Sequence, residues 1–308
     1  MHRVIVVAGE ALIDLLIAPD GRATAIPGGG PYNTARTIAR LGRPAAFLGR
    51  ISTDRFGALL RARLVEDGVD LRFVTDTDDP TTLALAELDE TGAATYRFYT
   101  DGTSAPGLTA DALPDVLRVD LTAVHVGTLG LVLEPMADAI EDLVSRTPDT
   151  VIVMLDPNGR PSATPDLAAW IARIERIGRR ADIAKVSVDD LRLLRPGLPP
   201  AQAANDLLDL GVRVVLLTDG AGSVKVVTPR DVTSLDPPEV DVVDTIGAGD
   251  AFGGGFVAAW VGAGHGRDDL DDNTALIEAS RFAIDVASFT CTRAGAEPPT
   301  AEELARTR

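Results

Sequence analysis

Short apolar runs rich in β-branched residues alternate along this chain with segments long enough to form a helix. The expected strands are residues 4–8, 45–51, 124–127, 151–155, 183–186 and 212–217, and the expected helices are residues 32–41, 135–145, 167–176 and 201–210. Strands that alternate with helices form a mostly parallel sheet with both faces covered. The alternation therefore predicts an α/β fold with ligand sites at the carboxyl ends of the strands.

Two regions, residues 11–26 and 81–100, break this alternation and have the pattern of strand pairs. In the second region, residues 82–88 and 94–99 are separated by the turn-forming residues 89–92, Asp-Glu-Thr-Gly. We expect these pairs to form a small antiparallel sheet that acts as a lid beside the strand ends. The alternative is that they extend the central sheet.

Chain length, charge and residue usage exclude several classes of function. The 308 residues suffice for one large α/β domain, and the formal net charge of −17 disfavours nucleic acid and anionic membranes as partners. One cysteine and three separated histidines disfavour a disulfide framework and a zinc site. The first apolar run is cut by Glu10 and Asp14, too early for a signal segment or membrane span, so we expect a cytoplasmic protein.

A glycine-rich turn near the C-terminal end has the features of an anion site. The extended run 240–243 leads into it and a helical pattern continues to about residue 263, which predicts strand, turn and helix. Gly247, Ala248 and Gly249 leave backbone N–H groups and the positive helix end accessible to a phosphate. Asp250, in the first helical turn, is placed to accept a proton from a nucleophile that attacks a phosphoryl group.

The same turn also fits a purely structural role. Glycines before a helix serve tight turns and close packing, and an acidic residue in a first turn complements the helix dipole. A dinucleotide-binding turn fits poorly, because the spacing is G-x-G-x-x-x-G and the match does not open a βαβ unit.

Two loops near the N-terminal end suit a polyol. Asp14 follows the first strand, and an ionised carboxylate can accept hydrogen bonds from two neighbouring hydroxyls. The glycines at 28–30 bring the backbone close to a ligand, and Asn33 is both donor and acceptor. The alternatives are a turn residue at position 14 and a plain turn and helix cap at positions 28–30.

Two later loops suit a nucleotide. The small residues of 218–223 follow a strong strand and can line a groove, although a glycine-rich hairpin has the same pattern. Ser187 and Asp190 follow another strand end and can order water or a metal near phosphates. They also match a helix start with Ser187 as the N-cap. His125 is expected in a strand near the core, and Cys291 is expected to be a buried helix residue.

Taken together, these segments resemble the ribokinase-like (PfkB) sugar kinases over essentially the whole chain. The family signatures are residues 28–35 with Leu41-Gly42, and Asp244-Thr-Ile-Gly-Ala-Gly-Asp250. Within the family the chain looks most like the fructokinases, on the segments 9–14, 27–30, 96–98, 156–161 and 291–298.

The resemblance implies a three-layer α/β/α sandwich, a single kinase domain over residues 1–308 with a β-lid from about 11–26 and 81–100. It implies Asp250 as the catalytic base, with Gly247, Ala248 and Gly249 as the anion hole. The residues that would bind the sugar are Asp14, Gly28, Gly29, Asn33, Arg97 and Arg160. The residues that would bind the nucleotide are Ser187, Thr218, Gly220, Gly222 and Gly249.

The chain departs from the family pattern at two places. Ser187 and Asp190 stand where the family has Asn-x-x-Glu, so the resemblance implies that Asp190 acts on Mg²⁺ through water. The loop after Thr218 is one residue short before its second glycine, which weakens the match of Gly222. A monovalent cation, K⁺, would bind at Asp244, the backbone of Ile246 and carbonyls of residues 288–295.

The implied reaction moves the γ-phosphoryl group of ATP to a primary sugar hydroxyl, with fructose as the leading acceptor and fructose 6-phosphate as the product. The open alternatives are another acceptor, such as 2-keto-3-deoxygluconate, ribose or a nucleoside, and a non-catalytic sugar-binding regulator on the same fold. The expected partners are the sugar and ATP, with no nucleic acid or membrane, and a homodimer is a further expectation.

Overall fold

The computed structural model describes residues 3–88, 94–115 and 120–306. Within them, nine strands form the main sheet in the order β13-β12-β11-β10-β9-β8-β1-β4-β5. The pairs from β11 to β5 are parallel, and β12 and β13 pair antiparallel at one edge. The strands of the main sheet are β1 Val4–Ala8, β4 Ala45–Ser52, β5 Asp70–Thr77, β8 Leu121–Gly127, β9 Ile152–Asp156, β10 Ile183–Ser187, β11 Val214–Thr218, β12 Val224–Val227 and β13 Val232–Leu235.

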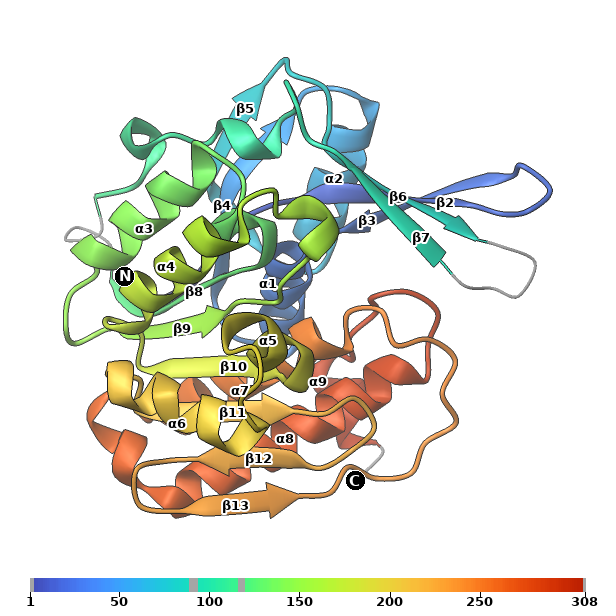
Figure 1. Ribbon diagram of the computed structural model, residues 1–308. Coiled ribbons are helices and arrows are strands. Elements are labelled where there is room, and N and C mark those ends of the chain that lie inside the picture. The colour runs from blue at the N-terminus through green and yellow to red at the C-terminus, as the bar shows by residue number, and fades with distance from the viewer. Residues whose placement is uncertain (1–2, 89–93, 116–119, 307–308) are drawn as a thin grey trace.

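Helices cover both faces of this sheet, as Figure 1 shows. The helices are α1 Gly30–Arg40, α2 Arg55–Glu66, α3 Met136–Arg146, α4 Leu167–Gly178, α5 Val188–Leu194, α6 Pro200–Leu210, α7 Ala248–Gly262, α8 Asn273–Cys291 and α9 Ala301–Ala305. One apolar core packs α3 to α6 on one face, and a second packs α1, α2, α7 and α8 on the other. The predicted three-layer α/β/α architecture is therefore confirmed.

A separate four-stranded sheet, in the order β3-β2-β6-β7, projects to the right of the main sheet in Figure 1. Its strands are β2 Leu12–Ile17, β3 Ala23–Gly28, β6 Leu83–Leu88 and β7 Ala94–Tyr99. The two hairpins, β2-β3 and β6-β7, join through a parallel pairing of β2 with β6. The strand pairs were predicted, and the alternative that they extend the central sheet is wrong. The expected turn at 89–92 lies outside the described residues.

The glycines of α7 explain how tightly this helix packs. A methyl group at Gly254 would lie 2.8 Å from Thr37 Cβ on α1, so only glycine lets the two helices approach this closely. Gly253 faces Met154 and His125 of the sheet, and Gly255 faces α8. Helix α7 is therefore packed against α1, α8 and the sheet at residues 253–255, and this packing holds its N-terminal end in place.

Two predictions about apolar segments need correction. Residues 240–243 form no strand, and Val242 and Val243 are 61% and 64% exposed. The sheet ends at β13, and the N–H of Val243 donates instead to the carbonyl of Cys291, at 2.8 Å. Cys291 is the last residue of α8 and is partly exposed, because its helix ends there. His125 is buried in β8, as predicted.

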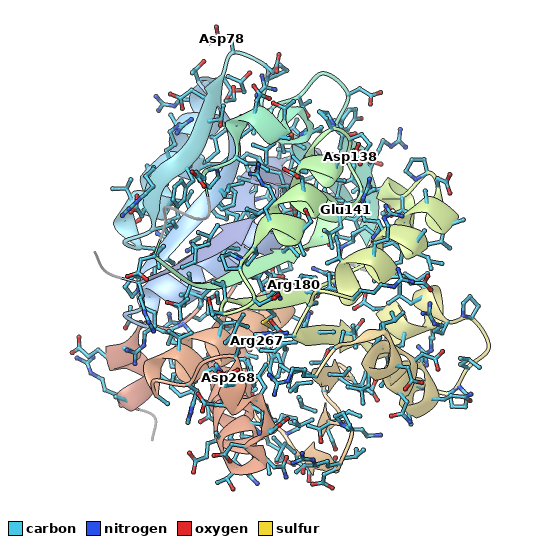
Figure 2. The ribbon with its side chains drawn as sticks, turned by 90° about the vertical axis from the view of Figure 1, so that its left-hand side faces the viewer. Asp78, Asp138, Glu141, Arg180, Arg267 and Asp268 are labelled. Carbon is cyan, nitrogen blue, oxygen red and sulfur yellow. The ribbon has the colours of Figure 1, made fainter. Side chains whose placement is uncertain are left out.

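A buried carboxylate holds the amino end of β10. Asp182 accepts hydrogen bonds from the guanidinium groups of Arg180, at 3.2 Å, and Arg267, at 2.6 Å. It also accepts from the N–H of Val153, at 2.9 Å. Figure 2 labels the two arginines, which come from segments far apart in the chain. This cluster lies near the amino end of β10, whereas the cavity residues follow the carboxyl ends of the strands. It therefore stabilises the fold and does not line a ligand site.

Candidate active site

The turn before α7 presents free backbone donors. Gly247, the N-cap residue, has φ 75°, a left-handed conformation that favours glycine. The N–H of Ala248 donates to the carbonyl of Thr245 at 3.2 Å. Within the described residues, no hydrogen bond engages the N–H groups of Gly249 and Asp250. These two N–H groups and the positive end of the helix are therefore available to an anion.

Asp250 is buried in this turn, with only 8% of its surface exposed. Its Oδ2 atom accepts a 2.9 Å hydrogen bond from Nδ2 of Asn33, on the first turn of α1. Burial raises the pKa of the Asp250 carboxyl, while this hydrogen bond and the charges of Lys185 and Arg160 oppose the rise. The carboxyl is therefore held more basic than an exposed aspartate but retains partners that favour its ionised form.

A cavity of about 790 Å³ opens at this turn, between the main sheet and the small sheet. The predicted site residues that line it are Asp14, Gly29, Asn33, Arg160, Ser187, Asp190, Ile246, Gly247, Gly249 and Asp250. These residues come from strand ends and helix starts spread over the chain, and the fold brings them to one place. The predicted residues that do not line it are Gly28, Arg97, Thr218, Gly220, Gly222, Asp244 and Ala248.

The strand alternation of β7 explains why Arg97 lies outside the cavity. Tyr96 and Phe98 line the cavity, and successive side chains of a strand point to opposite faces. Arg97 is exposed and pairs in register with Leu85. Apart from Asp14, the residues that face the cavity from the small sheet are therefore aromatic or aliphatic.

Asp14, on β2, faces the cavity next to the glycine turn. A methyl group at Gly28 would lie 2.1 Å from Asp14 Oδ2, so this glycine makes room for the carboxylate although it does not line the cavity. Burial and then the charge of Asp250 raise the pKa of Asp14 to about 7, while Arg160 lowers it. A carboxylate in this position suits a ligand that donates hydrogen bonds.

Ser187 and Asp190 form a capping box at the start of α5, the second of the two interpretations that the sequence left open. Asp190 Oδ2 accepts from the N–H and the hydroxyl of Ser187, and its Oδ1 accepts from the N–H of Gly159, at 2.7 Å. Both carboxylate oxygens are thus engaged. Thr218 is the register partner of Ser187 on the neighbouring strand β11, and the segment after it is a hairpin to β12.

Asp244 joins the turn to the end of α8. Its Oδ1 accepts from the N–H of Ile246 at 3.0 Å, and its Oδ2 accepts from the N–H of Gly295 at 2.8 Å. The segment 288–295, which was expected to complete a cation site, therefore does lie beside the turn. Asp244 contributes to this arrangement by binding backbone donors.

Comparison with known proteins places this geometry in a family. The model of the pfkB family of carbohydrate kinases matches residues 2–303. The chain belongs to the pfkB family. A fructokinase from Rhizobium leguminosarum bv. trifolii is 36% identical over 261 residues, which cover 83% of this chain and 79% of that protein.

Two solved kinase structures resemble this one over nearly the whole chain. A fructokinase from Xylella fastidiosa with bound ATP has a TM-score of 0.92 and 27% identity, and covers 99% of this chain and 98% of its own. An aminoimidazole riboside kinase from Salmonella enterica, complexed with aminoimidazole riboside and an ATP analogue, has a TM-score of 0.87 and 26% identity, with 99% of both chains covered.

This pfkB kinase has a buried site carboxylate, Glu10, for which the sequence pattern indicated no role. Glu10 accepts hydrogen bonds from the N–H groups of Gly30 and Gly130, each at 3.0 Å, and so connects the glycine turn to the end of β8. Burial raises its pKa to about 8, although the backbone hydrogen bonds oppose the rise. The available signal was a glutamate two residues after a fully buried strand, a place where a charge needs partners.

The acidic groups of the site do not form a metal cage. Within the described residues, no group of three or more His, Cys, Asp or Glu is arranged to hold a metal ion. Magnesium in kinases keeps several waters and binds through one or two carboxylates and the substrate phosphates, so a cage is not needed. Asp190 lies on the cavity wall, and both of its carboxylate oxygens accept hydrogen bonds within the protein.

Proposed function

We propose that this carbohydrate kinase transfers the γ-phosphoryl group of ATP to a primary hydroxyl of D-fructose and forms fructose 6-phosphate. The observation that carries the proposal is the position of Asp250. Its carboxyl lies at the free N–H groups of α7, hydrogen-bonded to Asn33, in the cavity that Asp14 also lines. The names of the relatives, fructokinases among them, support fructose as the acceptor.

In this proposal Asp250 takes the proton of the attacking sugar hydroxyl, and the N–H groups of Gly249 and Asp250 stabilise the negative charge on the transferred group. Asp14 accepts hydrogen bonds from the sugar hydroxyls, and Asn33 can both accept hydrogen bonds from them and donate to them. Gly29 lies beside these two residues. Arg160 balances the negative charge of the carboxylates and phosphates around it. Magnesium, when bound with ATP, supplies positive charge to the triphosphate.

We assign the nucleotide to the side of the cavity where Ser187 lies. Thr218 and the hairpin after it, which contains Gly220 and Gly222, would bind the part of the nucleotide that extends from Ser187 away from the sugar. We assign a potassium site to Asp244 and the backbone of Ile246. Backbone carbonyls of residues 288–295 would supply its remaining ligands. A potassium titration of the activity at constant ionic strength tests this last assignment.

We further propose that residues 1–308 act as one kinase domain and that the small sheet closes over the sugar. The apolar side chains that it turns to the cavity exclude water, which would otherwise hydrolyse ATP. A homodimer stays a prediction, which light scattering tests. No helix within the described residues is long and apolar enough to cross a membrane.

A coupled ATP-consumption assay against a panel of sugars and nucleosides tests the proposed acceptor. We expect the highest kcat/KM for fructose. Preference for a different acceptor class would contradict the proposal, and ligand binding without phosphorylation would indicate a non-catalytic regulator.

A riboside is the second candidate acceptor. Tyr96 and Phe98 face the cavity from β7, and aromatic rings stack on planar bases. The Salmonella enterica neighbour has aminoimidazole riboside bound. The same assay panel, with aminoimidazole riboside included, separates the two.

A further inference from the structure

Lys185, on β10, lies against the first turn of α7, in space that a larger residue at position 249 would occupy. A methyl group added to Gly249 would lie 2.9 Å from the Lys185 Nζ atom. The ammonium donates to both carboxylate oxygens of Asp156, at 3.2 and 3.0 Å. The two side chains are only 5% and 2% exposed. The absence of a side chain at position 249 therefore leaves room for the ammonium beside the turn.

Titratable groups surround this ammonium from four elements. They are Asp156 on β9, His125 on β8, Asp190 on α5 and Asp250 on α7. Burial lowers the pKa of Lys185, but the three carboxylates outweigh burial and the pKa lies above its ordinary value. Burial and then the Lys185 charge lower the pKa of His125 to about 3. At neutral pH, Lys185 is thus charged and His125 is neutral.

A buried ion pair is costly, because two charges leave water, and an apolar pair of similar size fills the same space without that cost. We propose that Lys185 is a positioning residue: its ammonium, held by Asp156, fixes the turn Gly247–Asp250 and adds positive charge to it. The inference rests on the proposed function, in which this turn binds the transferred phosphoryl group. Lys185 does not line the cavity, so it acts through the turn and not by ligand contact.

The decisive variant is the double substitution Lys185→Met and Asp156→Asn, which removes both charges and keeps similar side-chain sizes. We expect kcat to fall at least about tenfold, since the ammonium beside position 249 is lost from the turn that is proposed to stabilise the transition state. We expect the KM for the sugar to change less than about threefold, because ground-state contacts are kept. The acidic limb of the pH profile of kcat moves to higher pH, because the Lys185 charge lowers the pKa of Asp250 more than the Asp156 charge raises it.

The matched control is Arg173→Met. Arg173 is a mostly buried cation that pairs with Glu134, Asp138 and Glu141 between α3 and α4, away from the cavity, and Figure 2 labels Asp138 and Glu141 on α3. We expect this variant to lose thermal stability and to keep kcat and its pH profile. If kcat and its pH profile changed equally in Arg173→Met and in the double variant, the loss of any buried cation would explain the result, and the role of Lys185 would be contradicted.

A carbon-13 NMR titration of the Asp250 carboxyl, assigned with Asp250→Asn, needs no turnover. We expect the Asp250 titration to move to higher pH in the double variant. If the double variant does not fold, Gly249→Ala tests the same contact, since its methyl displaces the ammonium. The Asp250 titration is then the readout and should move to higher pH, because kcat also depends on Gly249 itself. Unchanged kcat and an unchanged Asp250 titration would overturn the role of Lys185. Lack of phosphorylation by the wild-type protein would contradict the proposed function alone, because the titration still reports on Lys185.

Discussion

Asn33 donates a 2.9 Å hydrogen bond to Asp250, a residue 217 positions later in the chain. The bond engages Oδ2 of the carboxylate, and within the described residues Oδ1 has no hydrogen-bond partner. It joins the first turn of α1 to the first turn of α7, so the residue proposed to bind the sugar also orients the proposed base. The free oxygen is the one available to a sugar hydroxyl.

Asp250→Asn removes the proposed base with almost no change in size. We expect turnover to fall at least about 10²-fold, because proton abstraction in the transition state is lost. Calorimetry should show sugar and nucleotide affinities close to those of the wild type. Near-normal turnover in this variant would rule out Asp250 as the base.

Glu10 makes the stability of the unliganded protein depend on pH. Its folded-state pKa of about 8 exceeds the ordinary 4.5, so between these values the folded state holds a proton that the unfolded state has lost. The wild type should therefore lose stability relative to Glu10→Gln as pH rises from about 4.5 to about 8. Thermal unfolding of both proteins across this range measures the effect. Parallel curves would contradict it.

Gly247→Ala should impair both stability and turnover. Alanine at φ 75° is strained, and its methyl would lie 2.5 Å from the Cβ atom of Ala296. Gly264→Ala is the control, since φ is 86° there and no atom lies within 4 Å. The control should cost about 1–2 kcal/mol of unfolding free energy, the strain of a left-handed alanine alone. We expect Gly247→Ala to cost more and to lower kcat, and equal effects in both variants would show that the contact is unimportant.

Gly254→Ala should disturb the site without touching it. The methyl would press on Thr37 Cβ at 2.8 Å and on the carbonyl of Thr34 at 3.0 Å, and would push α1 away from α7. Overpacking of this kind costs about 1–3 kcal/mol. Because the Asn33–Asp250 bond spans these helices, kcat should also fall. Gly178→Ala in α4, whose methyl meets only Leu210 at 3.5 Å, is the control that should keep kcat; a Gly254→Ala variant of normal kcat would refute the link.

The sequence predicted the strands and helices whose own residues show a clear apolar periodicity. The expected strands at 4–8 and 94–99 match β1 and β7, and the expected helix at 201–210 matches α6 to within one residue. The strand expected at 240–243 is absent, because a valine-rich segment forms a strand only where the edge of a neighbouring strand offers hydrogen-bond partners. The short strands β12 and β13 were not predicted, since four residues are too few for a clear pattern.

For the site, the residue types in the loops predicted a phosphate turn at Gly247–Asp250 and a polyol carboxylate at Asp14, and both line one cavity in the structure. Which side chains meet was decided by the tertiary structure alone. Lys185 reaches the turn because position 249 has no side chain, and Arg97 faces away because β7 alternates. The physical reason is that composition and periodicity are local properties of the chain. Contacts across 217 residues depend on sheet order and helix packing, which the sequence pattern does not encode residue by residue.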